Sequence, residues 1–314
     1  MTSIFLSFSN FKICALAIAW QNYENSKSKY IKTVSLKTNS CDLRVFTSHK
    51  ELNKSIANPE SIGLVPTMGS LHEGHISIIK KALNENEIVI VSIYVNPTQF
   101  NQREDFENYP RDVNSDIDKL KVFDRLLIYI PDDNEIYQKT ESKIYDFEGF
   151  ENILEGEFRP GHFYGVATVV EKLFRLLNPT SAYFGEKDFQ QLLLIKILIK
   201  KLSLNIKIVG CETIRDQDGL AMSSRNKLLS EKDRSIAANI PKILNFAKKE
   251  YSSLSPENIK RKVEEKFKDL DGCELEYFEI IDLSKKSIYL KESFKRIFIS
   301  VWVGKIRLID NISI

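Results

Sequence analysis

Two of the four histidines in this 314-residue chain, His72 and His75, lie three positions apart in the stretch VPTMGSLHEGH. Gly69 precedes the pair, Gly74 lies between the two histidines, and an apolar-periodic segment follows directly. A strand ending at Thr67, a tight turn and then a helix would direct both imidazoles the same way. A helix N-terminus has free N–H groups and partial positive charge, so it can seat a phosphate. Two imidazoles could then donate hydrogen bonds to that anion.

Other interpretations of the histidine pair stay open. A HxxH pair can ligate a metal, but zinc sites use three or four protein ligands, and only His49 and His162 remain elsewhere. The pair could also be surface or helix-capping residues. The stretch matches neither GxxxxGK[ST] nor GxGxxG, which disfavours a P-loop kinase and a dinucleotide site.

A second cluster, FGEKDFQQ (184–191), offers partners for a nucleotide. Lys187 is a compact cation suited to phosphate, and Asp188 could bind ribose hydroxyls. Gln190 and Gln191 add amides that both donate and accept hydrogen bonds. Standing alone, this cluster could be an ordinary charged loop.

Two more clusters are polar in other ways. GLAMSSRN (219–226) places the hydroxyls of Ser223 and Ser224 beside Arg225, a set that could clamp an anion. One of the serines can cap a helix at the same time. In YVNPTQF (94–100), Asn96 and Gln99 follow a β-branched run directly. Uncharged amides suit recognition of a hydroxyl or carboxylate rather than proton transfer.

The four clusters contain many anion donors and no evident nucleophile. The chain has no GxSxG elbow, and its four cysteines lie outside the clusters. This pattern favours positioning and electrostatic catalysis on a nucleotide, with a substrate supplying the nucleophile.

The apolar pattern predicts the scaffold that brings these clusters together. We expect buried strands at 61–67, 87–97, 125–131, 181–188 (strand and loop) and 205–211, and helices after His75 and at 112–123, 168–178 and 190–202. This alternation implies right-handed βαβ units and a parallel sheet, so the predicted class is a Rossmann-like α/β domain. Ligands of such sheets bind at the carboxyl ends of the strands, and each cluster follows a predicted strand.

The pattern changes beyond residue 213. Helices at 230–249 and 256–268 precede the short strands LEYFEIID, RIFISVWVG and IRLID, which predict a smaller α+β domain. We therefore expect a sheet domain at 43–213 and a C-terminal lid domain at 214–314, with a hinge near 215–219. Residues 1–42 lack a clear pattern. A signal, a transit segment and a poorly ordered extension stay open for them, and we favour the extension.

Composition limits the partners. Lys and Arg (45) nearly balance Asp and Glu (43), so a net charge of +2 gives no electrostatic case for nucleic acid. No segment is expected to span a membrane. The four cysteines form no CxxC pair, which favours a reducing compartment and a cytoplasmic location.

Seven stretches together resemble one known family. LVPTMGSLHEGH, VSIYVNPTQF, YPRD, EGEFRPGHFYGV, NPTSAYFGEKDFQQ, IRDQDGLAMSSRN and RLIDN occur in order from about residue 43 to the end. They are similar to the pantoate–β-alanine ligases, which belong to the nucleotidyltransferase superfamily with HIGH and KMSKS motifs. Tyr164 and Glu73 depart from that family's usual residues.

The resemblance implies a reaction. ATP and (R)-pantoate would give pantoyl adenylate and pyrophosphate, and the amine of β-alanine would then displace AMP to form pantothenate. It also implies a homodimer and a requirement for Mg²⁺, with Asp116 as a candidate ligand. His75 would be the residue that the family treats as a proton donor. We expect it to act mainly by hydrogen bonding to developing charge, because a carboxylate attacking phosphorus needs no proton.

The resemblance also assigns the remaining site residues. Those expected to bind ATP are Met68, Gly69, Ser70, Leu71, His72, Glu73, Gly74, His75, Gly185, Glu186, Lys187, Asp188, Ile214, Met222, Ser223, Ser224 and Arg225. The catalytic set among them is His75, His72, Lys187, Ser223, Ser224 and Arg225. Those expected at the pantoate and β-alanine sites are Gln99, Gln191, Asn96, Val166 and Val170.

Three alternatives remain. A nucleotidyltransferase that uses no amine is disfavoured by VNPTQF and GEKDFQQ. A non-catalytic nucleotide sensor would require a decayed motif, and none has decayed. A tRNA-charging enzyme would need an anticodon-binding domain, for which about 100 residues beyond the sheet leave little room, and the low net charge also disfavours it.

Overall fold

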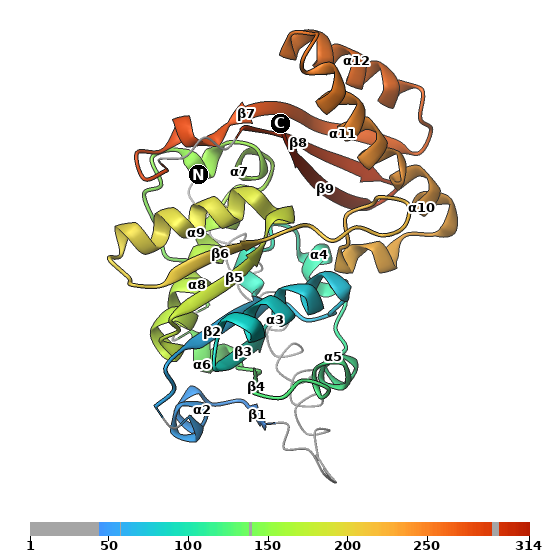
Figure 1. The fold of residues 1–314 in the computed structure, drawn as a ribbon. Coiled ribbons are helices and arrows are strands. Elements are labelled where there is room, and N and C mark those ends of the chain that lie inside the picture. Colours follow the sequence, from blue (N-terminus) through green and yellow to red (C-terminus); the bar gives the residue numbers. More distant parts are fainter. Residues whose placement is uncertain (1–43, 57, 138–139, 291–294) are drawn as a thin grey trace, which may run out of the picture. The chain divides into compact units, whose positions relative to one another are not determined.

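The computed structural model describes residues 44–56, 58–137, 140–290 and 295–314 (Figure 1). The predicted extension, 1–42, lies outside the described residues. Leu43–Ile314 form one compact unit. Among the described residues, no helix is both long and apolar enough to cross a membrane.

The first part of this unit is a parallel sheet of six strands in the order β1-β4-β3-β2-β5-β6. The strands are β1 Arg44–Phe46, β2 Ile62–Thr67, β3 Ile88–Ile93, β4 Leu126–Tyr129, β5 Ser181–Gly185 and β6 Lys207–Cys211. The predicted strands and the Rossmann-like class are confirmed; the edge strand β1 was not predicted. Chain order reverses between β2 and β5, and the crevice at such a switch point is where ligands bind in these sheets.

Helices cover both faces of the sheet (Figure 1). They are α2 His49–Ser55, α3 Glu73–Glu85, α4 Arg103–Glu107, α5 Val113–Leu120, α6 Asp133–Ile136, α7 Glu155–Phe158, α8 His162–Leu177 and α9 Phe189–Lys201. Successive strand residues point to opposite faces. Leu64 joins the core under α2, α8 and α9, whereas Val65 joins the core under α3 and α5. The sheet is therefore buried on both sides, as its β-branched strands require.

The C-terminal part is a small antiparallel sheet covered by helices. Its strands follow the order β7-β8-β9, at Cys273–Asp282, Lys295–Val303 and Ile306–Ser313. The helices are α10 Glu231–Ala237, α11 Asn239–Glu250 and α12 Pro256–Lys268, which share one apolar core with the sheet. The predicted α+β region is confirmed. The boundary at 213/214 and the hinge stay predictions.

Two predicted helices differ in extent. The helix expected at 230–249 is two, α10 and α11, which meet at Ala238. Pro241 explains the break, because proline lacks an N–H and its ring clashes with the carbonyl four residues earlier. The helix expected at 168–178 begins at His162 instead, after Gly161 in a left-handed conformation (φ 83°).

Candidate active site

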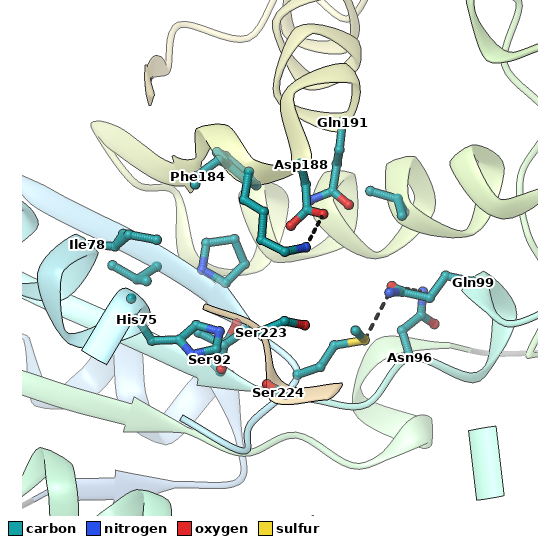
Figure 2. Close-up of a pocket in the computed structure, with 18 of the residues that line it drawn as sticks. His75, Ile78, Ser92, Asn96, Gln99, Phe184, Asp188, Gln191, Ser223 and Ser224 are labelled. Atoms are coloured by element: carbon teal, nitrogen blue, oxygen red, sulfur yellow. Dashed lines mark hydrogen bonds and ion pairs between the residues drawn. The ribbon is translucent and has the colours of Figure 1, made fainter. Parts of the chain in front are cut away.

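One pocket lies at the carboxyl ends of β2, β3, β5 and β6, at the point where the chain order of the parallel strands reverses (Figure 2). Figure 2 shows His75, Gln99 and Asp188, each from a different strand end, directed toward the same space. Of the predicted residues, it is lined by Met68, His72, Gly74, His75, Asn96, Gln99, Val166, Val170, Gly185, Lys187, Asp188, Gln191, Ile214, Met222, Ser223, Ser224 and Arg225. The structure thus brings all four polar clusters to one cavity.

Six predicted residues do not line the pocket: Gly69, Ser70, Leu71, Glu73, Glu186 and Asp116. Glu186 instead faces the C-terminal sheet, where its carboxylate accepts a hydrogen bond from Arg296 at 2.6 Å. Asn311 of β9 donates to the backbone carbonyls of Glu186 and Lys187, at 2.9 and 2.8 Å. These bonds anchor the turn after β5 to the C-terminal sheet.

The histidine pair caps its own helix. The His72 ring accepts a hydrogen bond from the Gly74 N–H through Nδ1 (3.2 Å), and the His75 ring accepts one from the His72 N–H through Nδ1 (3.3 Å). An accepting Nδ1 cannot carry the proton of a neutral imidazole, so the proton lies on Nε2 in both rings. Each ring can therefore offer one Nε2–H donor. The capping interpretation is confirmed, and it is compatible with the anion-donor interpretation, which stays a prediction.

Both imidazoles are held neutral. Burial lowers the pKa of His72 from 6.5 to about 4, and the charges of Lys187 and Lys227 add to the effect. Burial likewise lowers the pKa of His75 to about 3, with His72 and Lys187 as further causes. At neutral pH these two residues can donate hydrogen bonds without carrying charge, and the fixed positive charges nearby are those of Lys187 and Lys227.

Asp116 occupies the turn that was predicted to seat phosphate. Its two carboxylate oxygens accept the N–H groups of Ser70 (2.8 Å) and Leu71 (2.7 Å), and its side chain is buried. Gly69 and Ser70 both adopt positive φ (75° and 52°), which turns these N–H groups toward the carboxylate. A Cβ at Gly69 would lie 2.9 Å from the carboxylate. Asp116 is therefore an internal anion that shapes the turn, and these contacts argue against its predicted role as a Mg²⁺ ligand.

The glutamines after β5 have different roles. Gln191 lines the pocket, as predicted. Gln190 is buried, donating to the carbonyls of Phe150 and Ile153 and accepting the N–H of Glu155. Its amide thus supports the loop before α7 rather than a ligand.

Asn96 and Gln99 are held in place at the other end of the pocket. Asn96 caps the 3-10 helix η1 (Pro97–Gln99), and its amide donates to the side-chain oxygen of Gln99 (3.2 Å) and to the carbonyl of Gly165 (3.1 Å). The Gln99 amide in turn lies 2.9 Å from the sulfur of Met68. Helix α8 can pack this closely against η1 because residue 165 is a glycine; a Cβ there would lie 2.4 Å from the Thr98 carbonyl. Both amides are thus pre-positioned.

The segment Met222–Arg225 closes the pocket from the C-terminal side. Ser224 donates through Oγ to the carbonyl of Ser70 (3.1 Å), and Ser223 caps the 3-10 helix η4 (Ser224–Leu228). The guanidinium of Arg225 bonds both carboxylate oxygens of Asp105 (2.9 and 2.8 Å). In this arrangement the predicted anion clamp is engaged by a carboxylate of the protein.

Sequence reasoning did not assign roles to several residues that line the pocket. They include Tyr109, Arg159, His162 and Thr213. The histidine and arginine occur in RPGH, a stretch that bears no strand-end signal because it opens helix α8. Only the proximity of α8 to η1 brings them to Gln99.

Comparison with known proteins agrees with this geometry. The family model described as "Pantoate-beta-alanine ligase" matches residues 44–313. The chain belongs to the pantoate–β-alanine ligase family. Its curated relatives include the pantothenate synthetases of Flavobacterium psychrophilum (46% identical over 269 residues, 84% of this chain and 95% of the relative) and Christiangramia forsetii (48% over 268 residues, with the same shares).

Solved structures of ligases of this family are similar over most of this chain. The pantothenate synthetase of Thermus thermophilus matches with a TM-score of 0.80 at 34% identity, over 86% of this chain and 99% of that one. The ligase of Francisella tularensis, described as complexed with "Beta-gamma ATP and Beta-alanine", matches with a TM-score of 0.73 at 39% identity, over 86% and 97%. The expected family and fold are confirmed.

Proposed function

We propose that this pocket performs the family's reaction in two steps on one set of side chains. The reaction is the ATP-dependent joining of pantoate to β-alanine, and the proposal concerns how the residues divide the work. The single observation that carries it is that Lys187 and two neutral histidines line the same cavity as the amides of Gln99 and Gln191. One end thus suits a polyphosphate and the other a hydroxy acid.

In the first step, a pantoate carboxylate oxygen attacks the α-phosphorus of ATP. The bond from that phosphorus to the bridging oxygen breaks, and pyrophosphate leaves. The Nε2–H groups of His72 and His75 and the ammonium of Lys187 stabilise the charge that develops on the phosphates. Gln99 and Gln191 orient pantoate through its hydroxyl groups. No protein nucleophile is needed.

In the second step, the amine of β-alanine attacks the acyl carbon of pantoyl adenylate. The carbon–oxygen bond to AMP breaks, AMP leaves, and the nitrogen releases a proton. Val166 and Val170 line the same pocket. Their apolar side chains help to exclude water, which would otherwise hydrolyse the adenylate.

Mg²⁺ enters this proposal as part of the ATP substrate. Among the described residues, no group of three or more His, Cys, Asp or Glu side chains could hold a metal ion. Mg²⁺ commonly binds through substrate phosphates and retains water, so Mg·ATP fits a pocket that offers Lys187 and Asp188. A resident ion held by a protein cage does not fit.

We also propose that residues 214–314 act as a lid, that the enzyme is a homodimer, and that it works in the cytoplasm. The lid proposal applies chiefly to Met222–Arg225, which bonds the sheet part through the side chains of Ser224 and Arg225. The strands of the C-terminal sheet are tied more firmly, by the bonds of Arg296 and Asn311 to Glu186 and of Arg307 to Glu155. The dimer and the location are supported by the sequence resemblance and the cysteine pattern. Sedimentation of the purified protein tests the dimer, and fractionation of the source cells tests the location.

One assay tests the function. Release of AMP and pyrophosphate should require pantoate, and pantothenate, identified by mass, should appear only when β-alanine is also present. Reactions that lack one substrate are the controls. AMP release that proceeds equally with other hydroxy acids would contradict the proposal.

A further inference from the structure

Arg159 lies on the pocket wall beside Gln99. It follows α7 and directly precedes the Pro160-Gly161 turn that opens α8. Its side chain is 17% exposed, and its guanidinium lies within hydrogen-bonding range of the Gln99 carbonyl and the His162 ring. Burying a guanidinium costs free energy unless its charge and its N–H groups find partners, so the partners of Arg159 indicate its role.

His162 fixes one of these bonds. Its Nδ1 lies 2.8 Å from the Gln99 carbonyl, which can only accept, so Nδ1 carries the proton. Its Nε2 is then an acceptor and receives an N–H of Arg159 at 3.3 Å. Burial, with the charge of Arg159 as the next cause, lowers the pKa of His162 to about 3, so the ring stays neutral.

The carboxylate of Glu155 balances the positive charge of Arg159, but it does not accept hydrogen bonds from the Arg159 guanidinium. Glu155 lies 3.6 Å away, yet its oxygens already accept two N–H groups of Arg307 (2.7 and 2.8 Å) and the hydroxyl of Tyr277 (2.7 Å). Burial acts to raise the pKa of Glu155, but hydrogen bonds from Arg307 and its charge outweigh burial and hold the pKa at about 2. Glu155 thus remains ionised.

The guanidinium therefore keeps unused donors. Within the part of the chain that the structure describes, Arg159 makes two long hydrogen bonds, to His162 (3.3 Å) and to the Gln99 carbonyl (3.4 Å). A guanidinium has five N–H donors in a planar fork that matches a carboxylate. The pocket thus presents a positioned fork next to Gln99.

The other pocket cations have different places. Lys187 lies close enough to His72 and His75 to lower their pKa values, which puts it at the phosphate end. Arg225 bonds both oxygens of Asp105. Arg159 is the cation that lies against Gln99 and His162.

The reaction presents two carboxylates, and only one can occupy this fork. The pantoate carboxylate attacks phosphorus, so it must lie at the phosphate end with a free lone pair. The β-alanine carboxylate takes no part in bond formation and lies two methylene groups from the attacking nitrogen. We propose that Arg159 is the subsite for the carboxylate of the amine substrate, an inference that rests on the proposed function.

A comparison of two amines tests the subsite. 3-Aminopropanamide matches β-alanine in shape and keeps its amine, but a neutral amide replaces the negatively charged carboxylate. Arg159→Met retains the bulk and removes the fork. We expect this variant to lose about 100-fold in kcat/KM for β-alanine, as expected for a lost charged hydrogen-bonded pair. Its use of 3-aminopropanamide and its ATP–pyrophosphate exchange with pantoate should stay within about threefold of the wild type.

Matched variants separate binding from positioning. His162→Gln disturbs the support of Gln99 and should lower the rates with both amines together. Arg225→Met removes the other pocket guanidinium and should lower exchange without changing the ratio between the amines. Arg159→Lys keeps the charge without the fork and should retain part of the preference for β-alanine. Thermal unfolding checks that each variant is folded.

The outcomes are distinct. An equal loss with both amines in Arg159→Met would show that the residue only positions Gln99, and it would overturn the inference. Unchanged kinetics with β-alanine would overturn it as well. A wild-type enzyme that makes no pantothenate would instead overturn the proposed function, because that result does not depend on Arg159.

Discussion

Two walls of the pocket are built in opposite ways. The turn from Gly69 to His75 is held mainly from within the sheet part, by the Asp116 carboxylate and by the reciprocal histidine caps, with further bonds to Ser70 from Ser224 and Lys227. The segment Met222–Arg225 is held across to the sheet part by side-chain bonds, chiefly those of Ser224 and Arg225. One wall is thus a preorganised set of donors, whereas the other can exchange its partners. Catalysis gains from fixed dipoles and ligand exchange gains from movable ones.

The largest expected effect comes from the fixed wall. His75→Ala removes both an Nε2–H donor and a helix cap, and we expect adenylate formation to fall by about 100- to 1000-fold. Attack of β-alanine on preformed pantoyl adenylate should fall far less. Rapid-quench measurement of each half-reaction checks this. Equal losses in both would show that His75 does not act on the developing phosphate charge.

Asp116 supports that wall but does not line the pocket. Asp116→Ala leaves two buried N–H groups without acceptors, which should cost about 1–3 kcal/mol in the free energy of unfolding. We expect adenylate formation to slow by about tenfold because the histidine turn loosens. Asp118→Ala is the control on the same helix, since its ion pair with Lys121 is exposed. A stable Asp116→Ala variant that needs a markedly higher Mg²⁺ concentration than the wild type at the same ATP concentration would restore Asp116 as a metal ligand.

Substitutions that affect the Met222–Arg225 segment should change the kinetics less than those in the histidine turn. Asp105→Asn removes the carboxylate that holds Arg225, which on the proposed role of Arg225 would compete with ATP. We expect the KM for ATP to fall, by at most about fivefold, since both side chains are partly exposed and such pairs contribute up to about 1 kcal/mol. Glu107→Gln on the same helix, whose partner Arg103 is exposed, is the control. A raised KM would mean that the ion pair helps to form the site.

The smallest effect expected is that of pH on the first step. The lowered pKa values, about 4 for His72 and about 3 for His75, keep both rings neutral at pH 5.5 and above. Adenylate formation should thus vary by less than about twofold between pH 5.5 and 8 on their account. An inflection near pH 6.5 that disappears in His75→Gln would contradict this.

Stability should depend on the same two groups. In the unfolded chain both histidines become protonated near pH 6.5, whereas in the folded chain His72 does so only near pH 4 and His75 near pH 3. Stability is therefore lost as pH falls below 6.5. Denaturant titrations at several pH values should show a shallower loss in His75→Gln than in the wild type.

The sequence could predict what local patterns encode. β-Branched runs marked the strands, and the polar residues that follow them, such as His75, Lys187 and Gln99, line one pocket. Contacts between residues far apart in the sequence could not be predicted from local patterns. Asp116 meets Ser70 from 46 residues away, and Arg307 meets Glu155 from 152 residues away. A carboxylate followed by helical residues carries no local sign that its partner is a backbone turn.

The histidine caps have a consequence for how this site can evolve. Active sites usually reduce the stability of a fold, so that gains in one property are offset by losses in the other. Here one ring nitrogen of His72 secures a helix end while the other is free to serve the substrate. A change that discards the chemistry also discards a cap, typically about 0.5–2 kcal/mol. Selection for a durable fold and selection for turnover therefore favour the same side chain.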